Sequence, residues 1–193
     1  MLRIPRILTL TPLGRPHVRS VVASGRAGGL GILDLSEFGE RRDRETDRAL
    51  IARTSEALRG RPFGLRVPDW ETRVAALDLP PDNLRLILVP LAASETLRQV
   101  VEWAGRRGRF VLAEVGDESG AESAASAGAD GLLIVGEEAG GYVGRSSSLV
   151  LLQAVLSREI RGLPVWVRGG VGLQNAAGWI AAGAAGVALD GAL

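Results

Sequence analysis

The chain has 193 residues, of which 46% are hydrophobic, 23% charged and 4% aromatic, and its net charge is +1. It contains no lysine, no cysteine and a single histidine, His17, which excludes Schiff-base lysines, P-loops, thiol nucleophiles, Cys-ligated metals and HExxH-type histidine pairs. The near-neutral charge argues against a nucleic-acid partner. No apolar run reaches the roughly 18 residues of a membrane span, and the N-terminus lacks a signal-peptide pattern. We therefore expect a cytoplasmic domain with neither a nucleic-acid nor a membrane partner.

Eight short apolar runs along the chain are predicted strands. Three of them follow a repeated Ala-Gly-x-x-Gly pattern that begins at Ala27, Ala127 and Ala182. This pattern indicates a helix C-terminus with a glycine cap, followed by a buried strand. Strands that are apolar on both faces are typical of parallel sheets covered by helices. The predicted strands are Arg6–Leu10, Leu30–Leu35, Phe63–Val67, Leu84–Val89, Phe110–Val115, Gly131–Val135, Val165–Val167 and Gly186–Leu189.

Helical patterns separate most of these strands. In Ser94–Gly105, apolar residues recur at i, i+3, i+4 and i+7, and Ser94 is the expected N-cap. Two arginine clusters, one at Arg41, Arg42 and Arg44 and one at Arg106, Arg107 and Arg109, are expected on solvent-exposed faces. The predicted helices are one that begins at His17, then Arg44–Leu58, a short one around Glu71–Leu77, Ser94–Gly105, Ser148–Glu159 and Leu173–Ala182.

Eight βα alternations in one domain, residues 1–193, predict a (β/α)8 TIM barrel, with a doubly wound sheet as the competing architecture. The sequence stops directly after the eighth predicted strand, so the barrel is expected to lack its eighth helix. We expect an apolar strip between strands eight and one. We also expect the native polypeptide to continue past Leu193, or adjoining domains or a second copy to cover that strip.

In such barrels the functional site lies at the C-terminal ends of the strands. A glycine-rich loop at residues 136–144 carries Tyr142, and the two glycines after strand seven precede a predicted helix whose backbone N–H groups are suited to an anion. Each feature also has a plain structural interpretation, as a tight turn, a solvated loop or a packed aromatic ring. The polar residues at the predicted strand ends are Asp34, Arg66, Glu114, Glu137, Glu138, Arg168 and Asp190.

Taken together, five segments resemble the FMN-dependent nitronate monooxygenase family (2-nitropropane dioxygenase-like), which includes FMN-dependent enoyl reductases. Thr11–Gly14 resembles the family's first flavin-facing loop, Ala27–Leu33 its AGGLG segment and Arg61–Val67 its PFGVN strand. Ala129–Gly144 resembles its G-x-EAGGH-x-G motif, and Leu163–Val187 its phosphate-binding half. The resemblance implies a TIM barrel with FMN as cofactor, its phosphate held by the loops after strands seven and eight.

The resemblance also implies a reaction and a set of site residues. The reaction is the oxidation of alkyl nitronates or the reduction of enoyl thioesters, the latter with NAD(P)H as donor, so the expected partner is a small-molecule or acyl-thioester substrate. Tyr142 stands where the family has its histidine and is the candidate catalytic residue. No metal site is predicted. The candidate cofactor-binding residues are Pro12, Leu13, Arg66, Glu138, Gly140, Gly141, Gly169, Gly170, Asp190 and Gly191.

The chain departs from the family at several of these positions. A phenol with a pKa of about 10 is not a near-neutral base, although it can donate a proton. Leu13 replaces a methionine, Arg66 replaces the asparagine that faces the flavin ring, and Asp190-Gly191 replaces a Gly-Thr pair. A carboxylate beside a phosphate dianion is repulsive.

Three hypotheses follow. The first is an FMN oxidoreductase with altered chemistry, in which Tyr142 donates a proton and Arg66 balances flavin charge or binds a substrate anion. The second is a catalytically degenerate barrel that serves as a structural or docking domain; its Arg-rich, Ala/Gly-rich composition looks like the barrel segments of large polyketide synthases. The third, a non-flavin phosphate-binding barrel, is disfavoured by the absence of lysine.

Overall fold

A computed structural model of the chain describes residues 4–36, 43–73, 80–90, 94–141, 143–158, 160 and 162–190. Strands and helices alternate along it. The strands are β1 (Ile7–Leu10), β2 (Leu30–Asp34), β3 (Phe63–Arg66), β4 (Leu84–Val89), β5 (Phe110–Val115), β6 (Gly131–Val135), β7 (Val165–Arg168) and β8 (Gly186–Leu189). The helices are α1 (Val18–Arg26), α2 (Arg44–Leu58), α3 (Trp70–Arg73), α4 (Ser94–Gly105), α5 (Glu118–Ala127), α6 (Ser148–Ser157) and α7 (Ala176–Ala181).

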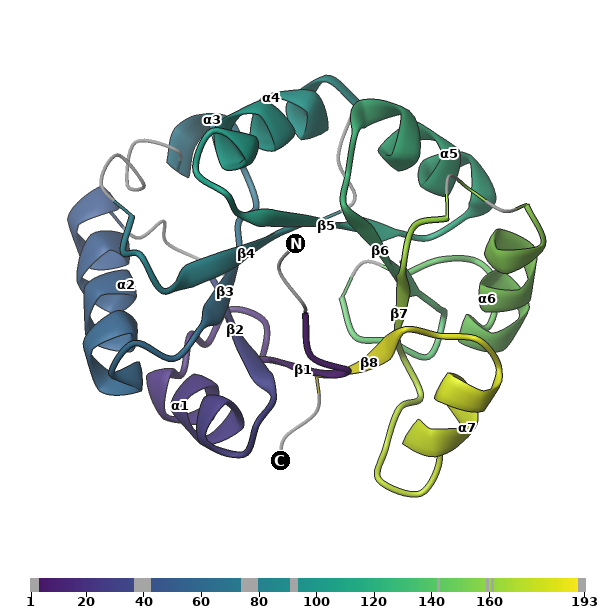
Figure 1. The fold of residues 1–193 in the computed structure, drawn as a ribbon, viewed down its shortest axis with the longest axis horizontal. Coiled ribbons are helices and arrows are strands. Elements are labelled where there is room, and N and C mark those ends of the chain that lie inside the picture. The colour runs from purple at the N-terminus through teal and green to yellow at the C-terminus, as the bar shows by residue number, and fades with distance from the viewer. Residues whose placement is uncertain are drawn as a thin grey trace.

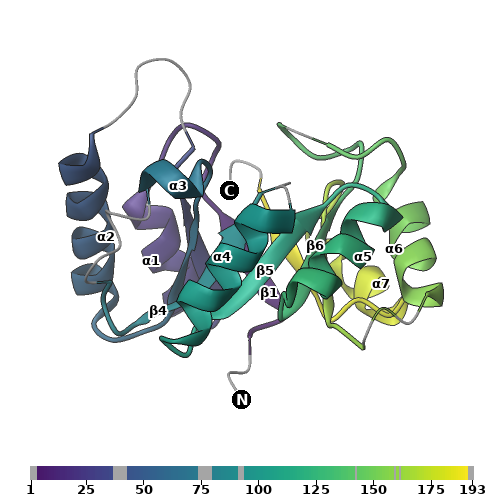
Figure 2. The same ribbon diagram turned by 90° about the horizontal axis from the view of Figure 1, so that it is seen from above.

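The eight strands form one closed barrel in which each strand pairs with its sequence neighbours and β8 pairs in parallel with β1. The helices surround this barrel, as Figures 1 and 2 show. The predicted TIM barrel is thus confirmed. Within the described residues, which run to Asp190, no helix follows β8, so the ring of helices is open between α7 and α1 (Figure 1).

Two apolar cores hold the barrel together, because successive residues of a strand point to opposite faces. One core fills the barrel interior and the other lies between the strands and the surrounding helices. The inner core contains Leu8, Leu10, Leu30, Ile32, Leu86, Leu88, Phe110, Leu112, Leu133, Trp166 and Ala188. Within each strand, the residue two positions after an inner-core residue also points into the barrel.

One predicted helix begins three residues later than expected, and one observed helix, α5, was not predicted. The last helix begins at Ala176, not at Leu173, because the Asn175 side chain accepts a hydrogen bond from the Gly172 N–H and donates one to the Gly170 carbonyl, which holds this segment as a turn. Helix α3 covers Trp70–Arg73 and overlaps the start of the helix predicted around Glu71–Leu77. Residues 74–79 and Glu159 lie outside the described part of the chain.

One arginine that we expected on a solvated face is buried. Arg109 donates hydrogen bonds to the carbonyls of Leu84, Pro80 and Pro81, and its guanidinium lies 5.4 Å from the centre of the Trp103 ring. It joins the start of β5 to the segment before β4, so the prediction was wrong for Arg109. Arg41 and Arg42 lie outside the described residues. None of the described helices has both the length and the apolar character needed to cross a membrane.

Candidate functional site at the barrel mouth

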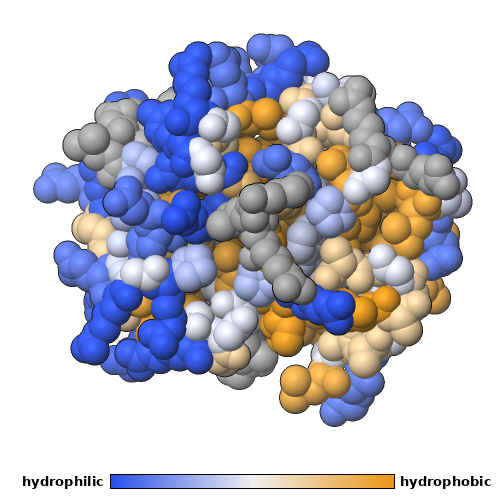
Figure 3. Space-filling model, viewed as in Figure 1, coloured by the Kyte–Doolittle hydropathy of each residue, from blue (hydrophilic) through white to orange (hydrophobic). Residues whose placement is uncertain are grey.

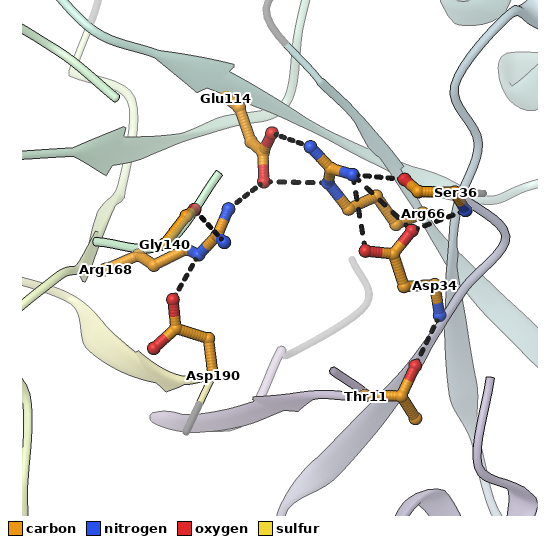
Figure 4. A network of polar contacts seen from close by, with 8 residues as sticks. All are labelled: Thr11, Asp34, Ser36, Arg66, Glu114, Gly140, Arg168 and Asp190. Carbon is orange, nitrogen blue, oxygen red and sulfur yellow. Dashed lines mark hydrogen bonds and ion pairs between the residues drawn. The ribbon is translucent and has the colours of Figure 1, made fainter. Parts of the chain in front are cut away.

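Five charged residues from five different strands meet inside the C-terminal end of the barrel (Figure 4). Asp34, Arg66, Glu114 and Arg168 lie near the ends of β2, β3, β5 and β7, and Asp190 directly follows β8. Because side chains alternate along a strand, each sits two positions beyond an inward-facing residue. Arg168, for example, follows Trp166 of the inner core in this way. We refer to Asp34, Arg66, Glu114, Arg168 and Asp190 as the ion layer.

Arg66 is the first centre of the ion layer. Its Nε and Nη2 donate to the two carboxylate oxygens of Glu114 at 3.0 and 2.8 Å, and its Nη1 donates to Ser36 Oγ at 2.6 Å and lies 3.3 Å from Asp34 Oδ2. The Arg66 side chain is 7% exposed, and those of Asp34 and Glu114 are 2% exposed. Burial acts to lower the Arg66 pKa, but Glu114 and Asp34 outweigh it, so the pKa lies above its ordinary value.

Arg168 is the second centre. Its Nη1 donates to Glu114 Oε1 at 2.9 Å, so one carboxylate bridges both arginines, and its Nε donates to Asp190 Oδ2 at 2.8 Å. Its Nη2 donates to the Gly140 carbonyl at 2.9 Å. The Arg168 side chain is 5% exposed and that of Asp190 is 26% exposed. Each nitrogen of the Arg66 and Arg168 guanidinium groups thus has a partner within the protein.

Two loops meet over the ion layer. In the first, the Thr11 hydroxyl accepts a hydrogen bond from the Asp34 N–H at 2.9 Å. In the second, Gly140 is held by Arg168, and a Cβ added at Gly141 would lie 3.3 Å from Leu13 Cδ2. Loop 11–14 and loop 136–141 are therefore in contact at the mouth of the barrel.

The third part of the candidate site lies beside the start of α6. Glu138 accepts hydrogen bonds from the Ser148 N–H at 3.0 Å and the Ser148 hydroxyl at 2.9 Å. Burial acts to raise the Glu138 pKa, but these bonds and a backbone N–H outweigh it, so the pKa lies below its ordinary value. A Cβ added at Gly170 would lie 3.6 Å from the Glu138 Cβ. The Gly-Gly turn after β7 is therefore packed against a glutamate.

The structure gathers most of the predicted site residues into two neighbouring groups. Leu13, Arg66, Gly140, Gly141 and Asp190 surround the barrel mouth, while Glu138, Gly169 and Gly170 lie at the start of α6. Pro12 is solvent-exposed, and Tyr142 and Gly191 lie outside the described residues.

Sequence reasoning placed Asp34, Glu114 and Arg168 at strand ends but gave them no role, and it missed Ser36 and Ser148. Strand-end position was the available signal for the first three. Ser36 contacts Arg66, which is 30 residues away in the chain, and Ser148 contacts Glu138, which is 10 residues away. No local sequence pattern indicates either serine.

The described residues do not fit FMN at the positions that the resemblance implies. Arg66, expected at the flavin ring, is bound to two carboxylates and a serine. At the expected phosphate site, Glu138 packs against Gly170 and Asp190 directly follows β8, so two acidic residues stand where the resemblance implies a dianion. The N–H of Gly172 is already bound by Asn175.

No family model matches the chain. The chain is 30% identical over 182 residues to a (3aS,4S,5R,7aS)-5-hydroxy-7a-methyl-1-oxo-octahydro-1H-indene-4-carboxyl-CoA dehydrogenase of Rhodococcus jostii. It is 31% identical over 182 residues to the Mycobacterium tuberculosis protein of the same name. These matches cover 89% of this chain but 46% and 47% of the relatives. The chain thus spans about half the length of the curated relatives it matches.

Two solved structures are similar over nearly the whole chain. FabK from Thermotoga maritima has a TM-score of 0.76 and 24% identity, and the match covers 93% of this chain and 57% of FabK. Nitroalkane oxidase from Streptomyces ansochromogenes has a TM-score of 0.75 and 23% identity, with 94% and 64% covered. The resemblance inferred from the motifs is thereby confirmed, as a likeness of fold.

Proposed function

We propose that this chain is a catalytically degenerate barrel of the flavin-oxidoreductase type, which does not bind FMN and serves as a structural or docking part of a longer protein in the cytoplasm. The observation that carries the proposal is the ion layer. It places paired charges at the point where the resemblance implies a flavin ring, and every nitrogen of the two guanidinium groups already has a partner within the protein.

The energetics of the ion layer support this proposal. Breaking a buried ion pair by removing one partner costs about 3–5 kcal/mol, because it leaves an uncompensated charge in a low-dielectric environment. A ligand that drew Arg66 away would leave the buried carboxylates of Asp34 and Glu114 with one cation fewer. A flavin at the mouth would have to compensate this loss before gaining any net affinity. The same ion pairs tie five strands together, which suits a rigid structural part.

The test is FMN binding by the purified chain. We expect no visible flavin absorbance after purification and no quenching of FMN fluorescence when protein is added at micromolar concentrations. A double variant, Glu138→Gln with Asp190→Asn, removes both carboxylates from the expected phosphate site. It is expected to bind FMN no better, because Arg66 with its partners Ser36 and Glu114 still fills the ring site. Stoichiometric flavin in the unmodified protein would overturn the proposal.

A second candidate function is an FMN-dependent oxidoreductase with altered chemistry. The observation that favours it is the 30% identity to curated proteins named as CoA dehydrogenases. In this candidate, Tyr142 supplies a proton and the expected substrate is an alkyl nitronate or an enoyl thioester, the latter with NAD(P)H as donor. The looser likeness to polyketide synthase barrels supports the first proposal instead, because it also implies a non-catalytic segment of a larger protein.

Tyr142→Phe separates the two candidates, because it removes only the phenolic hydroxyl. Consumption of NAD(P)H with an enoyl thioester, or of oxygen with a nitronate, is measured for the protein supplied with FMN. The degenerate barrel shows no turnover in either form. The oxidoreductase loses at least ten-fold in kcat on substitution while its affinity for FMN is unchanged.

A further inference from the structure

The outer face of β1 is uncovered at Ile7, while the next outward-facing residue, Thr9, is 8% exposed. Among the described strand residues, Ile7 is the large hydrophobic residue that is exposed, at 49%. Other outward-facing strand residues, such as Leu33 of β2 and Ile87 of β4, are fully buried. Figure 1 shows why: no described helix lies between α7 and α1, outside β8 and β1.

A groove of about 690 Å³ runs along this uncovered face. Its floor is formed by the outward-facing residues Ile7 and Thr9 of β1 with Leu189 of β8, and its wall by Ser20, Ala23 and Ser24 of α1. We call it the α1–β1 groove. It has the position of the helix that, in a complete (β/α)8 barrel, follows the eighth strand and packs beside the first helix.

Charge around the groove is strongly one-sided. Residues 4–29, which include β1 and α1, contain four arginines (Arg6, Arg15, Arg19 and Arg26) and no acidic residue, although the whole chain carries only +1. Arg6, Arg19 and His17 line the groove itself. On the other side, residues 169–189, which include α7 and β8, carry no charge. Figure 3, coloured by hydropathy, shows a surface that is hydrophilic toward α1 and α2 and more hydrophobic toward α6 and α7.

We propose that the α1–β1 groove binds one amphipathic α-helix, whose apolar side packs on Ile7, Ala23 and Leu189 and whose acidic side chains meet Arg6 and Arg19. The occupant completes the ring of helices around the barrel. The proposal concerns the outer face of the barrel only, so FMN binding at the mouth would leave it intact.

The test uses the 1–193 chain and two synthetic helical peptides of about 18 residues, a length sufficient for helix formation in water. Both carry the same apolar stripe at i, i+3, i+4 and i+7; one has glutamates on its flanks and the other lysines. Fluorescence anisotropy of labelled peptide is expected to show micromolar binding of the glutamate peptide, at least ten-fold weaker binding of the lysine peptide, and loss of affinity as salt is raised.

Two variants locate the binding. Ala23→Trp fills the groove from an exposed position of α1 and is expected to abolish binding, with an unchanged circular dichroism spectrum as evidence of folding. The double variant Arg6→Glu with Arg19→Glu is expected to lower the affinity for the glutamate peptide at least ten-fold and to raise the affinity for the lysine peptide. Arg53→Glu, an exposed charge reversal on α2, is the matched control and leaves both affinities unchanged.

Three outcomes would overturn the proposal. One is that neither peptide binds, and another is that both bind equally, which would remove the acidic character of the occupant. The third is dimerisation of the chain, measured by light scattering and abolished by Ala23→Trp, which would make a second copy the occupant. Binding of the glutamate peptide that Ala23→Trp leaves intact would likewise place the contact elsewhere and count against the groove.

Discussion

At the scale of single residues, the ion layer is the feature that distinguishes this barrel. Glu114 receives three hydrogen bonds from two arginines at 3.0, 2.8 and 2.9 Å, and its side chain is 2% exposed. Exposed ion pairs contribute little to stability because water screens both charges. The buried pairs of the ion layer are screened much less, so the loss of one member is expected to matter far more than the loss of a surface arginine.

Arg66→Met is therefore expected to lower the free energy of unfolding by about 3–5 kcal/mol, because it leaves two buried carboxylates undercompensated. Adding Asp34→Leu removes one of these carboxylates and is expected to recover at least half of that loss. The control is Arg98→Met, which breaks an exposed pair with Glu95 and changes the free energy by about 0.5 kcal/mol or less. Urea unfolding measures the free energy of all three variants. If Arg66→Met lowered it as little as the control does, water would have to enter the ion layer.

At the scale of elements, close contact between a helix and a strand depends on a missing side chain. A Cβ added at Gly31 of β2 would lie 2.6 Å from both the Cα and the carbonyl oxygen of Val21 in α1. These are backbone atoms, so they cannot rotate away as a side chain would. Gly31 is thus what lets α1 lie directly on β2, and the position of α1 in turn forms the wall of the α1–β1 groove.

Gly31→Ala is expected to destabilise the protein by about 1–3 kcal/mol, as overpacking does in other cores. Gly178→Ala is expected to have the opposite effect, because a Cβ added at this position within α7 meets open space. It is expected to stabilise the protein by about 0.5–1 kcal/mol, because alanine loses less backbone entropy in a helix than glycine. Thermal unfolding of the two variants is expected to shift in opposite directions. Equal shifts would show that α1 moves away from β2 at little cost.

At the scale of the whole molecule, acid stability follows from carboxylates at helix N-termini. The Gly120 N–H and the Ser119 hydroxyl hold the pKa of Asp117 below its ordinary value, and hydrogen bonds from Thr46 do the same for Asp43. The pKa of Glu138, whose carboxylate lies beside the start of α6, is also lowered. In each case the unfolded chain binds the proton more tightly, so these groups stabilise the fold above their ordinary pKa near 4 and lose that contribution as pH falls through the lowered value.

We expect the free energy of unfolding to change little between about pH 5 and pH 7 and to fall below about pH 4. Asp117→Asn keeps an N-cap side chain but removes the titrating carboxyl, so the decline between about pH 4 and pH 2 is expected to be shallower. Urea unfolding at a series of pH values measures this. An identical decline in the variant would show that Asp117 makes no contribution.

Much of the fold was predictable, for local reasons. The runs at Leu84–Val89, Phe110–Val115, Gly131–Val135 and Gly186–Leu189 were predicted with the bounds that the structure has. Each is a mainly apolar run bounded by turn residues, which is a signal contained within the run and its flanks. The start of α7 was not predictable in this way, because Asn175 holds the preceding turn through contacts with Gly170 and Gly172 that compete with helix formation.

The sequence by itself determined the eight strands, their order and the polar residues at their ends, because these depend on apolar runs and on alternation along each strand. Only the tertiary structure decided what those polar residues do. Arg66 and Glu114 are 48 positions apart, and Arg168 and Glu114 are 54 apart. Closure of the barrel brings them within hydrogen-bond distance, where two arginines and three carboxylates compensate one another. The polar residues that the sequence places at the strand ends, as candidates for binding a ligand, are thus already bound to one another.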